Sequence, residues 1–325
     1  MLQMMKSHEK IVARADKLRL TNNTRSELNS MRKEVLKSIR ESFGKLKNNP
    51  QNPWKITVGK ETKTGSLYRG TAMESSSDID VVVTLNYQQK NGTKKPPSAE
   101  LVLERIHSSI PKKFQTKINK RSVQVSKKVT STGKKKTISM DVVPAIVQVG
   151  PKFKKSTWWH GVSKVEDKRG WIQFNPTHQK EIMEKLKRRS EQKDDPTALI
   201  ICLKHWRDRQ SKQPCKLPSY VLEVLVWEDY RECKEEKDLT SRFNRVLTGF
   251  KRIHGKGIYF SEPVNDSHRP SNVKAATGKP QLHDPSNTSV NLVAHLSRDD
   301  VVWWGKKAEE AANKKKSFEQ IFGNI

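Results

Sequence analysis

The feature that most constrains this chain is a short apolar stretch that opens with Asp78 and Asp80 and runs to Val83. Its β-branched residues favour a strand, on which residues two apart project to the same side. The two carboxylates therefore project together, and they repel each other unless a cation lies between them. Hard oxygen ligands of this kind suit Mg²⁺ or Mn²⁺. The pattern predicts a strand that begins with half of a divalent-metal site.

A polar loop with a Gly-Ser pair, Gly65 and Ser66, precedes these aspartates. Its backbone N–H groups and hydroxyl predict a cradle for a phosphate. A third acidic residue, Asp141, lies in a later apolar run rich in β-branched residues. Alternating segments on both sides of residues 130–134 predict a strand–turn–strand unit that brings Asp141 near the aspartate pair. A phosphate cradle beside clustered carboxylates is typical of phosphoryl or nucleotidyl transfer.

Length and charge bound the organisation and the partner of the chain. Its 325 residues predict two lobes, at about 150 residues per domain. A formal net charge of +29 favours an anionic partner much larger than one nucleotide, namely a nucleic acid. An anionic membrane surface and a purely solubilising charge are the alternatives.

Cysteine usage and hydropathy indicate the compartment. Three scattered cysteines predict free thiols in a reducing environment rather than a disulfide framework. The first ten residues lack the apolar centre of a signal peptide, and no apolar run approaches the roughly 18 residues of a membrane span. We therefore expect a cytoplasmic protein, with a nuclear location also open, and no membrane partner.

Two basic surfaces are expected to contact the polyanion. The first is a ridge on a helical segment over residues 6–46, where basic residues recur at helical spacing. The alternative is an ordinary solvated helix face. The second is a stretch between Ile106 and Met140 that holds no acidic residue and continues beyond Asp141. The residues assigned to nucleic-acid binding are Lys6, Lys10, Arg14, Lys17, Lys152, Lys154 and Lys155.

The second half of the chain reads as mainly helical. Asp195 and Pro196 predict the start of a helix that is apolar nearly all round and therefore central to its lobe. Lys204 emerges near the end of this helix, where a lysine with its charged end in solvent is the ordinary interpretation. Residues 158–171 are expected to form a loop between the lobes.

These motifs together resemble one family over essentially the whole chain. The Gly65–Val83 stretch, Asp141 in MDVVPAI, LIICLKHW at 199–206, LPSY at 217–220 and DPSNTSVNL at 284–292 occur in its order. The chain is similar to the polymerase-β-type nucleotidyltransferases, and among them to the animal branch with cyclic GMP-AMP synthase, the cGAS-like receptors and the oligoadenylate synthases. The resemblance implies an α+β, bilobed fold. Its parts would be a spine helix over 1–50, a nucleotidyltransferase core with a mixed sheet over 51–157, and a C-terminal helical-bundle lobe over 158–325.

The resemblance also implies a role for each site residue. Asp78, Asp80 and Asp141 would hold two Mg²⁺ or Mn²⁺ ions, and Asp141 would help to deprotonate the attacking ribose hydroxyl. The nucleotide substrates, ATP, GTP or other NTPs, would be bound by five further residues. Gly65 and Ser66 would hold the donor triphosphate, Lys204 and Ser219 would reach the phosphates, and Tyr220 would stack on a base.

Activation by a double-stranded nucleic acid on a basic face opposite the active site is the last implication. Because the His/Cys zinc ribbon of the vertebrate DNA sensor is missing, double-stranded RNA is favoured over DNA, with a dimer on the nucleic acid as an option. The leading hypothesis is an RNA-activated cyclic dinucleotide synthase, an innate immune sensor in antiviral defence. The alternatives are a linear 2′–5′ oligoadenylate synthase, a catalytically inactive RNA-binding protein of this fold, and a constitutive template-independent polymerase or tRNA-end enzyme.

Overall fold

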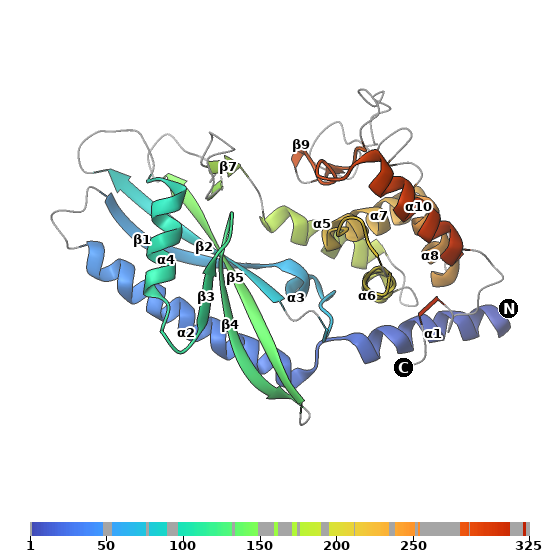
Figure 1. The fold of residues 1–325 in the computed structure, drawn as a ribbon, viewed down its shortest axis with the longest axis horizontal. Coiled ribbons are helices and arrows are strands. Elements are labelled where there is room, and N and C mark those ends of the chain that lie inside the picture. The colour runs from blue at the N-terminus through green and yellow to red at the C-terminus, as the bar shows by residue number, and fades with distance from the viewer. Residues whose placement is uncertain are drawn as a thin grey trace. The chain divides into compact units, whose positions relative to one another are not determined.

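The structure is a computed structural model in which helices and a mixed sheet form an α+β fold (Figure 1). It describes residues 2–47, 54–75, 78–89, 97–131, 134–148, 159–161, 171–173, 176–189, 195–210, 212–233, 238–250, 253, 280–285, 287–312 and 321–322. The chain divides into two compact units, one of residues 20–180 and one of residues 1–19 with 181–325. The predicted α+β class and mixed sheet are confirmed.

Two consecutive helices begin the chain, α1 (Leu2–Leu18) and α2 (Asn22–Lys47). The passage from one unit to the other falls in the short break between them. The apolar stripe of α2 is fully buried, as its three- and four-residue spacing requires. Its members are Leu28, Met31, Val35, Leu36, Ile39 and Phe43.

The sheet of the first unit has seven strands in its described part, in the order β1-β2-β5-β4-β3, with β6 and β7 added beside β5 (Figure 1). The strands are β1 (Trp54–Thr64), β2 (Asp78–Gln89), β3 (Gln115–Ile118), β4 (Val123–Ser131), β5 (Lys134–Gln148), β6 (Trp159–Gly161) and β7 (Trp171–Gln173). Strands β2 and β5 run parallel, and the other paired neighbours run antiparallel.

One face of this sheet packs in the core of the unit. Ile79 and Val81 on β2 and Met140 and Val142 on β5 join side chains of α2 and of α4 (Ala99–Ser109) in one hydrophobic cluster. Because side chains alternate along a strand, the aspartates of β2 and β5 lie on the opposite face.

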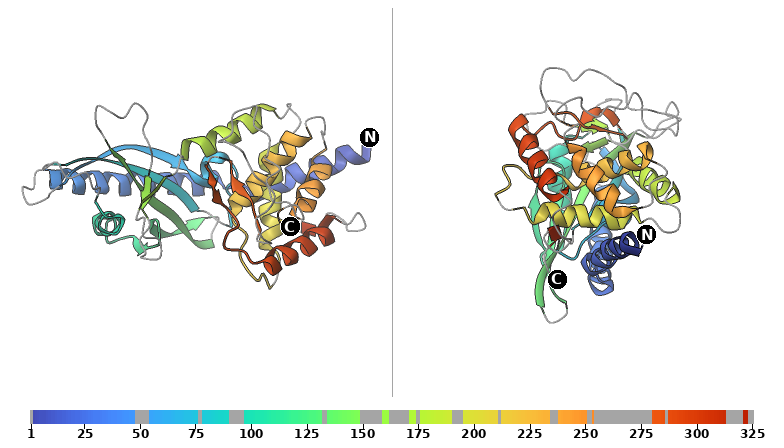
Figure 2. Two further views of the ribbon diagram at one scale, coloured as in Figure 1. Left: turned by 90° about the horizontal axis from the view of Figure 1, so that it is seen from above. Right: turned by 90° about the vertical axis from the view of Figure 1, so that its right-hand side faces the viewer.

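Helices dominate the second unit, where they are drawn from yellow to red in Figure 2. In addition to α1, the helices of this unit are α5 (Pro176–Arg189), which crosses the unit boundary, α6 (Pro196–Asp208), α7 (Ser219–Glu232), α8 (Leu239–Thr248) and α10 (Arg298–Ala312). A two-stranded sheet of β8 (His283–Asp284) and β9 (Asn287–Asn291) accompanies them. Among the described residues, no helix is long and apolar enough to cross a membrane.

Helix α6 is the buried centre of this unit, as its sequence predicts. Its cap is the expected one, because the Asp195 side chain accepts a hydrogen bond from the Thr197 backbone N–H at 2.9 Å and Pro196 begins the helix. The helix contacts α1, α7 and α8. Trp206 near its end packs edge-to-face on Trp304, with 5.8 Å between the ring centroids.

The expectation that residues 158–171 form a loop is wrong at both ends of this range. The short strands β6 and β7 pair there and extend the sheet from β5. Trp171 is buried, and its indole Nε1–H donates to the backbone carbonyl of Pro97 at 2.8 Å. This hydrogen bond ties the added strands to the residues just before α4. The sequence did not indicate the strands because β-branched and aromatic residues alone do not reveal strands as short as these.

Candidate active site

Strand register brings two of the three predicted aspartates side by side. In the parallel pair β2–β5, Asp80 is the register partner of Asp141, and Asp78 is the partner of Ser139. Neighbouring strands lie about 4.8 Å apart, and register partners project to the same face. The sequence placed Asp141 near the aspartate pair, and the structure adds the register that sets it beside Asp80.

The Gly-Ser turn lies directly against Asp80. Thr64 at the end of β1 is the register partner of Asp80, and Gly65 follows with a φ of 78°, a conformation that favours glycine. A Cβ added at Gly65 would lie 2.0 Å from Asp80 Oδ2, so a larger residue does not fit there. Ser66 follows in the first turn of the short helix α3 (Gly65–Arg69), where it is partly exposed. Local geometry therefore requires the glycine, and the structure brings Gly65 and Asp80 into contact.

Two serines that the sequence analysis missed hold the aspartates. Ser122 Oγ donates to Asp141 Oδ1 at 3.0 Å, and Ser139 Oγ donates to Asp78 Oδ1. Ser139 stands two residues before Asp141 on β5, so the alternation of that strand is a signal that would have placed it on the same face. Ser122 comes from the turn between β3 and β4, and no local pattern indicates it.

Burial raises the pKa of Asp141, and the nearby charge of Asp78 raises it further. Hydrogen bonds from the side chains of Ser122 and Asn119 act in the opposite direction. Asn119 and Ser122 belong to one turn, closed by a 2.8 Å hydrogen bond from the Asn119 N–H to the Ser122 carbonyl. Asp141 is thus a half-buried carboxylate with a raised proton affinity and a fixed orientation.

The aspartates fit a divalent metal in chemistry and in register. Their carboxylate oxygens are the hard ligands that Mg²⁺ and Mn²⁺ prefer. Within the described part of the chain, however, no group of three or more His, Cys, Asp or Glu side chains converges closely enough to hold a metal ion. Asp80 and Asp141 stand at paired positions of β2 and β5, with Asp78 two residues before Asp80, and the role of the three as metal ligands stays a prediction.

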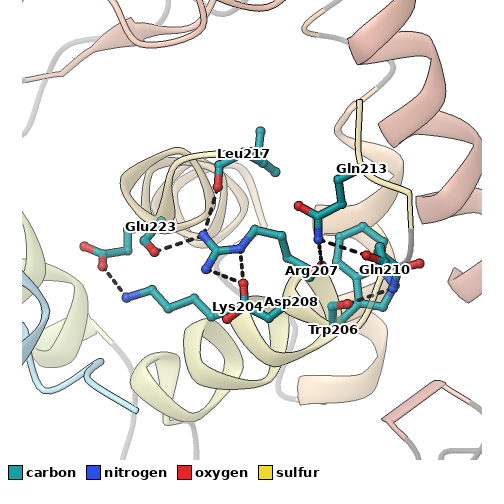
Figure 3. A network of polar contacts seen from close by, with 9 residues as sticks. Lys204, Trp206, Arg207, Asp208, Gln210, Gln213, Leu217 and Glu223 are labelled. Atoms are coloured by element: carbon teal, nitrogen blue, oxygen red, sulfur yellow. Dashed lines mark hydrogen bonds and ion pairs between the residues drawn. The ribbon is translucent and has the colours of Figure 1, made fainter. Parts of the chain in front are cut away.

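The three residues predicted on the helical lobe are all engaged with protein groups: Lys204 (Figure 3) and Ser219 where α6 meets α7, and Tyr220 with β8. Lys204 Nζ forms an ion pair with Glu223 at 2.8 Å, and the two side chains are only 3% and 1% exposed. Lys204 is therefore not a lysine whose charged end lies in solvent. Tyr220 Oη donates to Asp284 Oδ1 at 3.1 Å.

Arg207 organises the start of α7 and was also missed. Its Nη1 donates to the Leu217 carbonyl and to Ser219 Oγ, both at 2.9 Å (Figure 3). The sequence signal was present, because a charged residue in a helix that is buried all round requires a partner. Which partner it takes depends on how α6 packs on α7.

The expected ridge on α1 is wrong at Arg14. This side chain is buried, with its guanidinium Nη2 donating to the Phe322 carbonyl at 2.6 Å and lying 2.9 Å from His205 Nε2. The C-terminal segment around Phe322 covers this position, while Lys10 and Lys17 are exposed. The Lys6 side chain and the residues Lys152, Lys154 and Lys155 lie outside what the structure describes.

A mixed sheet whose parallel strands carry neighbouring aspartates beside a Gly-Ser turn defines a nucleotidyltransferase fold. Residues 5–188 match the family described as the Second Messenger Oligonucleotide or Dinucleotide Synthetase domain, SMODS. The chain therefore belongs to this family of cyclic dinucleotide and oligonucleotide synthetases, which confirms a relationship to the cGAS-like nucleotidyltransferases. Enzymes of this family generally use divalent metal ions.

Solved structures of bacterial enzymes share the fold over nearly the whole chain. CdnC of Escherichia coli MS115-1, solved with ATP, is 17% identical with a TM-score of 0.67, covering 97% of both chains. The CD-NTase CdnG of Bradyrhizobium diazoefficiens, in complex with GTP, is 11% identical with a TM-score of 0.63, covering 96% of this chain and 94% of CdnG. The Vibrio cholerae cyclic AMP-GMP synthase DncV, a prokaryotic cGAS homologue, is 12% identical with a TM-score of 0.62, covering 95% and 93%. A comparison with curated protein sequences gives no match.

Proposed function

We propose that the protein is a nucleotidyltransferase that joins two NTPs into a cyclic dinucleotide second messenger and is activated by double-stranded RNA. The observation that carries the catalytic part is the register of Asp80 with Asp141, next to the Gly65 turn. Membership of the SMODS family supports the same reaction class. ATP and GTP are the proposed substrates, as CdnC and CdnG were solved with these nucleotides.

The chain's own residues divide the chemistry between them. Gly65 and Ser66 hold the triphosphate of the donor nucleotide, and Asp141 accepts the proton of the attacking ribose hydroxyl. Its raised pKa, caused mainly by burial, suits this role because it increases the basicity of the carboxylate. The hydroxyl oxygen bonds to the α-phosphorus, the bond from that phosphorus to the bridging oxygen breaks, and pyrophosphate leaves. A second transfer closes the ring.

Asp78, Asp80 and Asp141 would hold the divalent ions, Mg²⁺ or Mn²⁺. When bound, a pair of such ions stabilises the attacking and leaving oxygens of an in-line displacement. Ser122 and Ser139 keep Asp141 and Asp78 oriented for this purpose. Lys204 contacts phosphate in this scheme only after its ion pair with Glu223 opens.

Activation by RNA is proposed from the charge of the chain. A net charge of +29 favours a long polyanion, and an A-form duplex is recognised through its shape, its phosphates and its 2′-hydroxyls. Lys10 and Lys17 are exposed on α1 and remain candidates for phosphate contact. Arg14 is buried, so we no longer propose that it contacts phosphate. An innate immune sensor in the cytoplasm is the biological role that we infer, with a dimer on RNA left as an option.

Product analysis tests this proposal directly. The purified protein is incubated with labelled ATP and GTP, with Mg²⁺ or Mn²⁺, and with duplex RNA, duplex DNA or neither, and the products are separated by chromatography. We expect a cyclic dinucleotide and pyrophosphate with RNA only. The Asp141→Asn variant is the matched control, because it keeps the shape of the side chain and removes its charge. Equal turnover without any duplex would instead indicate a constitutive polymerase or tRNA-end enzyme.

A linear 2′–5′ oligoadenylate synthase is the second candidate. The family description names oligonucleotides as well as dinucleotides, and this supports a linear oligonucleotide as the alternative product. A ladder of linear products from ATP alone would establish it in place of the cyclic product. If no combination of metal, NTP and duplex releases pyrophosphate, the protein is an inactive RNA-binding member of the fold.

A further inference from the structure

A row of polar side chains crosses the sheet through the aspartates. Thr64 pairs with Asp80, Asp80 with Asp141, Asp141 with Gln124 on β4, and Gln124 with Lys117 on β3. Register partners on adjacent strands project to the same face. All five side chains therefore lie on the face opposite the hydrophobic core, in one line across the strands.

One end of this row, on β1, lies at the Gly65 turn proposed to hold the donor triphosphate, and the other end lies on β4 and β3. Gly65, which follows Thr64, lies against Asp80 on the β1 side. With strands about 4.8 Å apart, Gln124 starts one strand beyond Asp141, and Lys117 starts two strands beyond it, about 10 Å away. If the donor triphosphate is held by Gly65 and Ser66, the nucleotide whose hydroxyl attacks approaches from the side of β4 and β3.

Both side chains at that end are available to a ligand. Lys117 is exposed and Gln124 is partly exposed. Within the described residues, neither side chain has a hydrogen bond or an ion pair. Other lysines of the same basic stretch are already paired with glutamates, as Lys113 is with Glu34 and Lys127 with Glu27.

We propose that Gln124 and Lys117 form the subsite of the acceptor nucleotide, with the Lys117 ammonium on its 5′-phosphates and the Gln124 amide on its sugar or base edge. An ammonium makes a charge-assisted contact with phosphate, and an amide offers both a donor and an acceptor. This assignment rests on the proposed function, and it adds a substrate-contacting surface from β3 and β4 to the aspartates of β2 and β5. It predicts that the two nucleotides are bound by different strands of the sheet.

The test separates the two nucleotides chemically. A 2′,3′-dideoxy-NTP donates but cannot attack, and an α,β-methylene NTP attacks but cannot donate, so together they form one linkage. The KM of each is measured for the wild type, Lys117→Gln and Gln124→Ala, with adenine and guanine versions of both. We expect Lys117→Gln to raise the acceptor KM about tenfold or more and to leave the donor KM unchanged. Gln124→Ala is expected to raise the acceptor KM and to change the preference between adenine and guanine.

Lys128→Gln is the matched control. Lys128 is exposed on the same face of β4, but it stands four residues, or about 13 Å, along the strand from Gln124. The Lys128→Gln substitution removes the same charge as Lys117→Gln, so any loss of activator binding should be equal in the two variants. Equal acceptor KM values for Lys117→Gln and Lys128→Gln in an active enzyme would overturn the subsite and leave the proposed function standing. A wild-type protein that forms no linkage from any pair would refute the proposed function itself, and the subsite with it.

Discussion

Replacing Lys204 by methionine distinguishes a structural role of this lysine from a nucleotide-binding role. The Lys204–Glu223 pair spans 2.8 Å between side chains that are 3% and 1% exposed. Removing one partner of a buried ion pair typically costs about 3–5 kcal/mol. With a urea slope of about 2 kcal/mol/M, the unfolding midpoint should fall by roughly 2 M.

The assay is urea unfolding followed by tryptophan fluorescence, since Trp206 lies two residues beyond Lys204 on the same helix. Glu223→Leu alone should destabilise to a similar extent, because it removes the carboxylate that pairs with the buried ammonium. The double variant, Lys204→Met with Glu223→Leu, should recover most of the loss, since a buried ion pair and an apolar pair of similar volume are often equivalent. Lys216→Met is the control for loss of a lysine, because Lys216 is exposed nearby.

Two results would refute this reasoning. If Lys204→Met leaves the urea midpoint where it is and weakens binding of an NTP analogue instead, the pair with Glu223 is incidental and Lys204 serves the nucleotide. A large stability loss in Lys204→Met that the double variant does not recover would also contradict it, because the cost would then come from lost packing.

Three further perturbations test other parts of the site. Asp141→Ala should abolish turnover while RNA affinity, measured by fluorescence anisotropy, stays unchanged; a parallel loss of RNA binding would indicate unfolding. Gly65→Ala should destabilise by at least the roughly 1–2 kcal/mol of a left-handed non-glycine residue and lower turnover, because its Cβ would meet Asp80; a normal thermal midpoint with normal kinetics would contradict the close approach. Reversing the charges of Lys10 and Lys17 to glutamate should weaken RNA binding and reduce its salt dependence; unchanged affinity would place the RNA surface elsewhere.

The parts of the fold that were predictable from sequence are those that depend on the spacing of residues within one helix or strand. The α2 stripe, the N-cap of α6 and the alternation of β2 follow from spacing within one element, and each is found as predicted. The β4–β5 hairpin also follows, from the alternating segments around residues 130–134. The parallel pairing of β5 with β2, which brings Asp141 to the aspartate pair, is a tertiary contact that the hairpin does not set. The exact partner, Asp80 rather than Asp78, depends on a register between strands about 60 residues apart in sequence, and no local pattern fixes that.

Arg14 shows why the same periodicity fails for surfaces. Its spacing from Lys10 and Lys17 is helical, so the three share one side of α1, as expected. Whether that side meets water is decided by a segment about 300 residues later, where Phe322 packs under 2% exposed and offers its carbonyl to the guanidinium. Spacing reports the direction of a side chain, but its solvent exposure is a property of the tertiary fold.

The same distinction explains why one kind of residue was not recognised from the sequence. Ser122, Arg207 and Glu223 are all partners of residues that were recognised, namely Asp141, Ser219 and Lys204. A charged or catalytic group can be recognised by its own type and setting, whereas its partner is an ordinary residue made important by contact. A lysine in a fully apolar helix does predict that a carboxylate exists, because an unpaired buried charge costs several kcal/mol. The partner of a charged residue in a core helix is expected in another equally apolar element, and here that element is α7, where Glu223 lies among buried aliphatic residues.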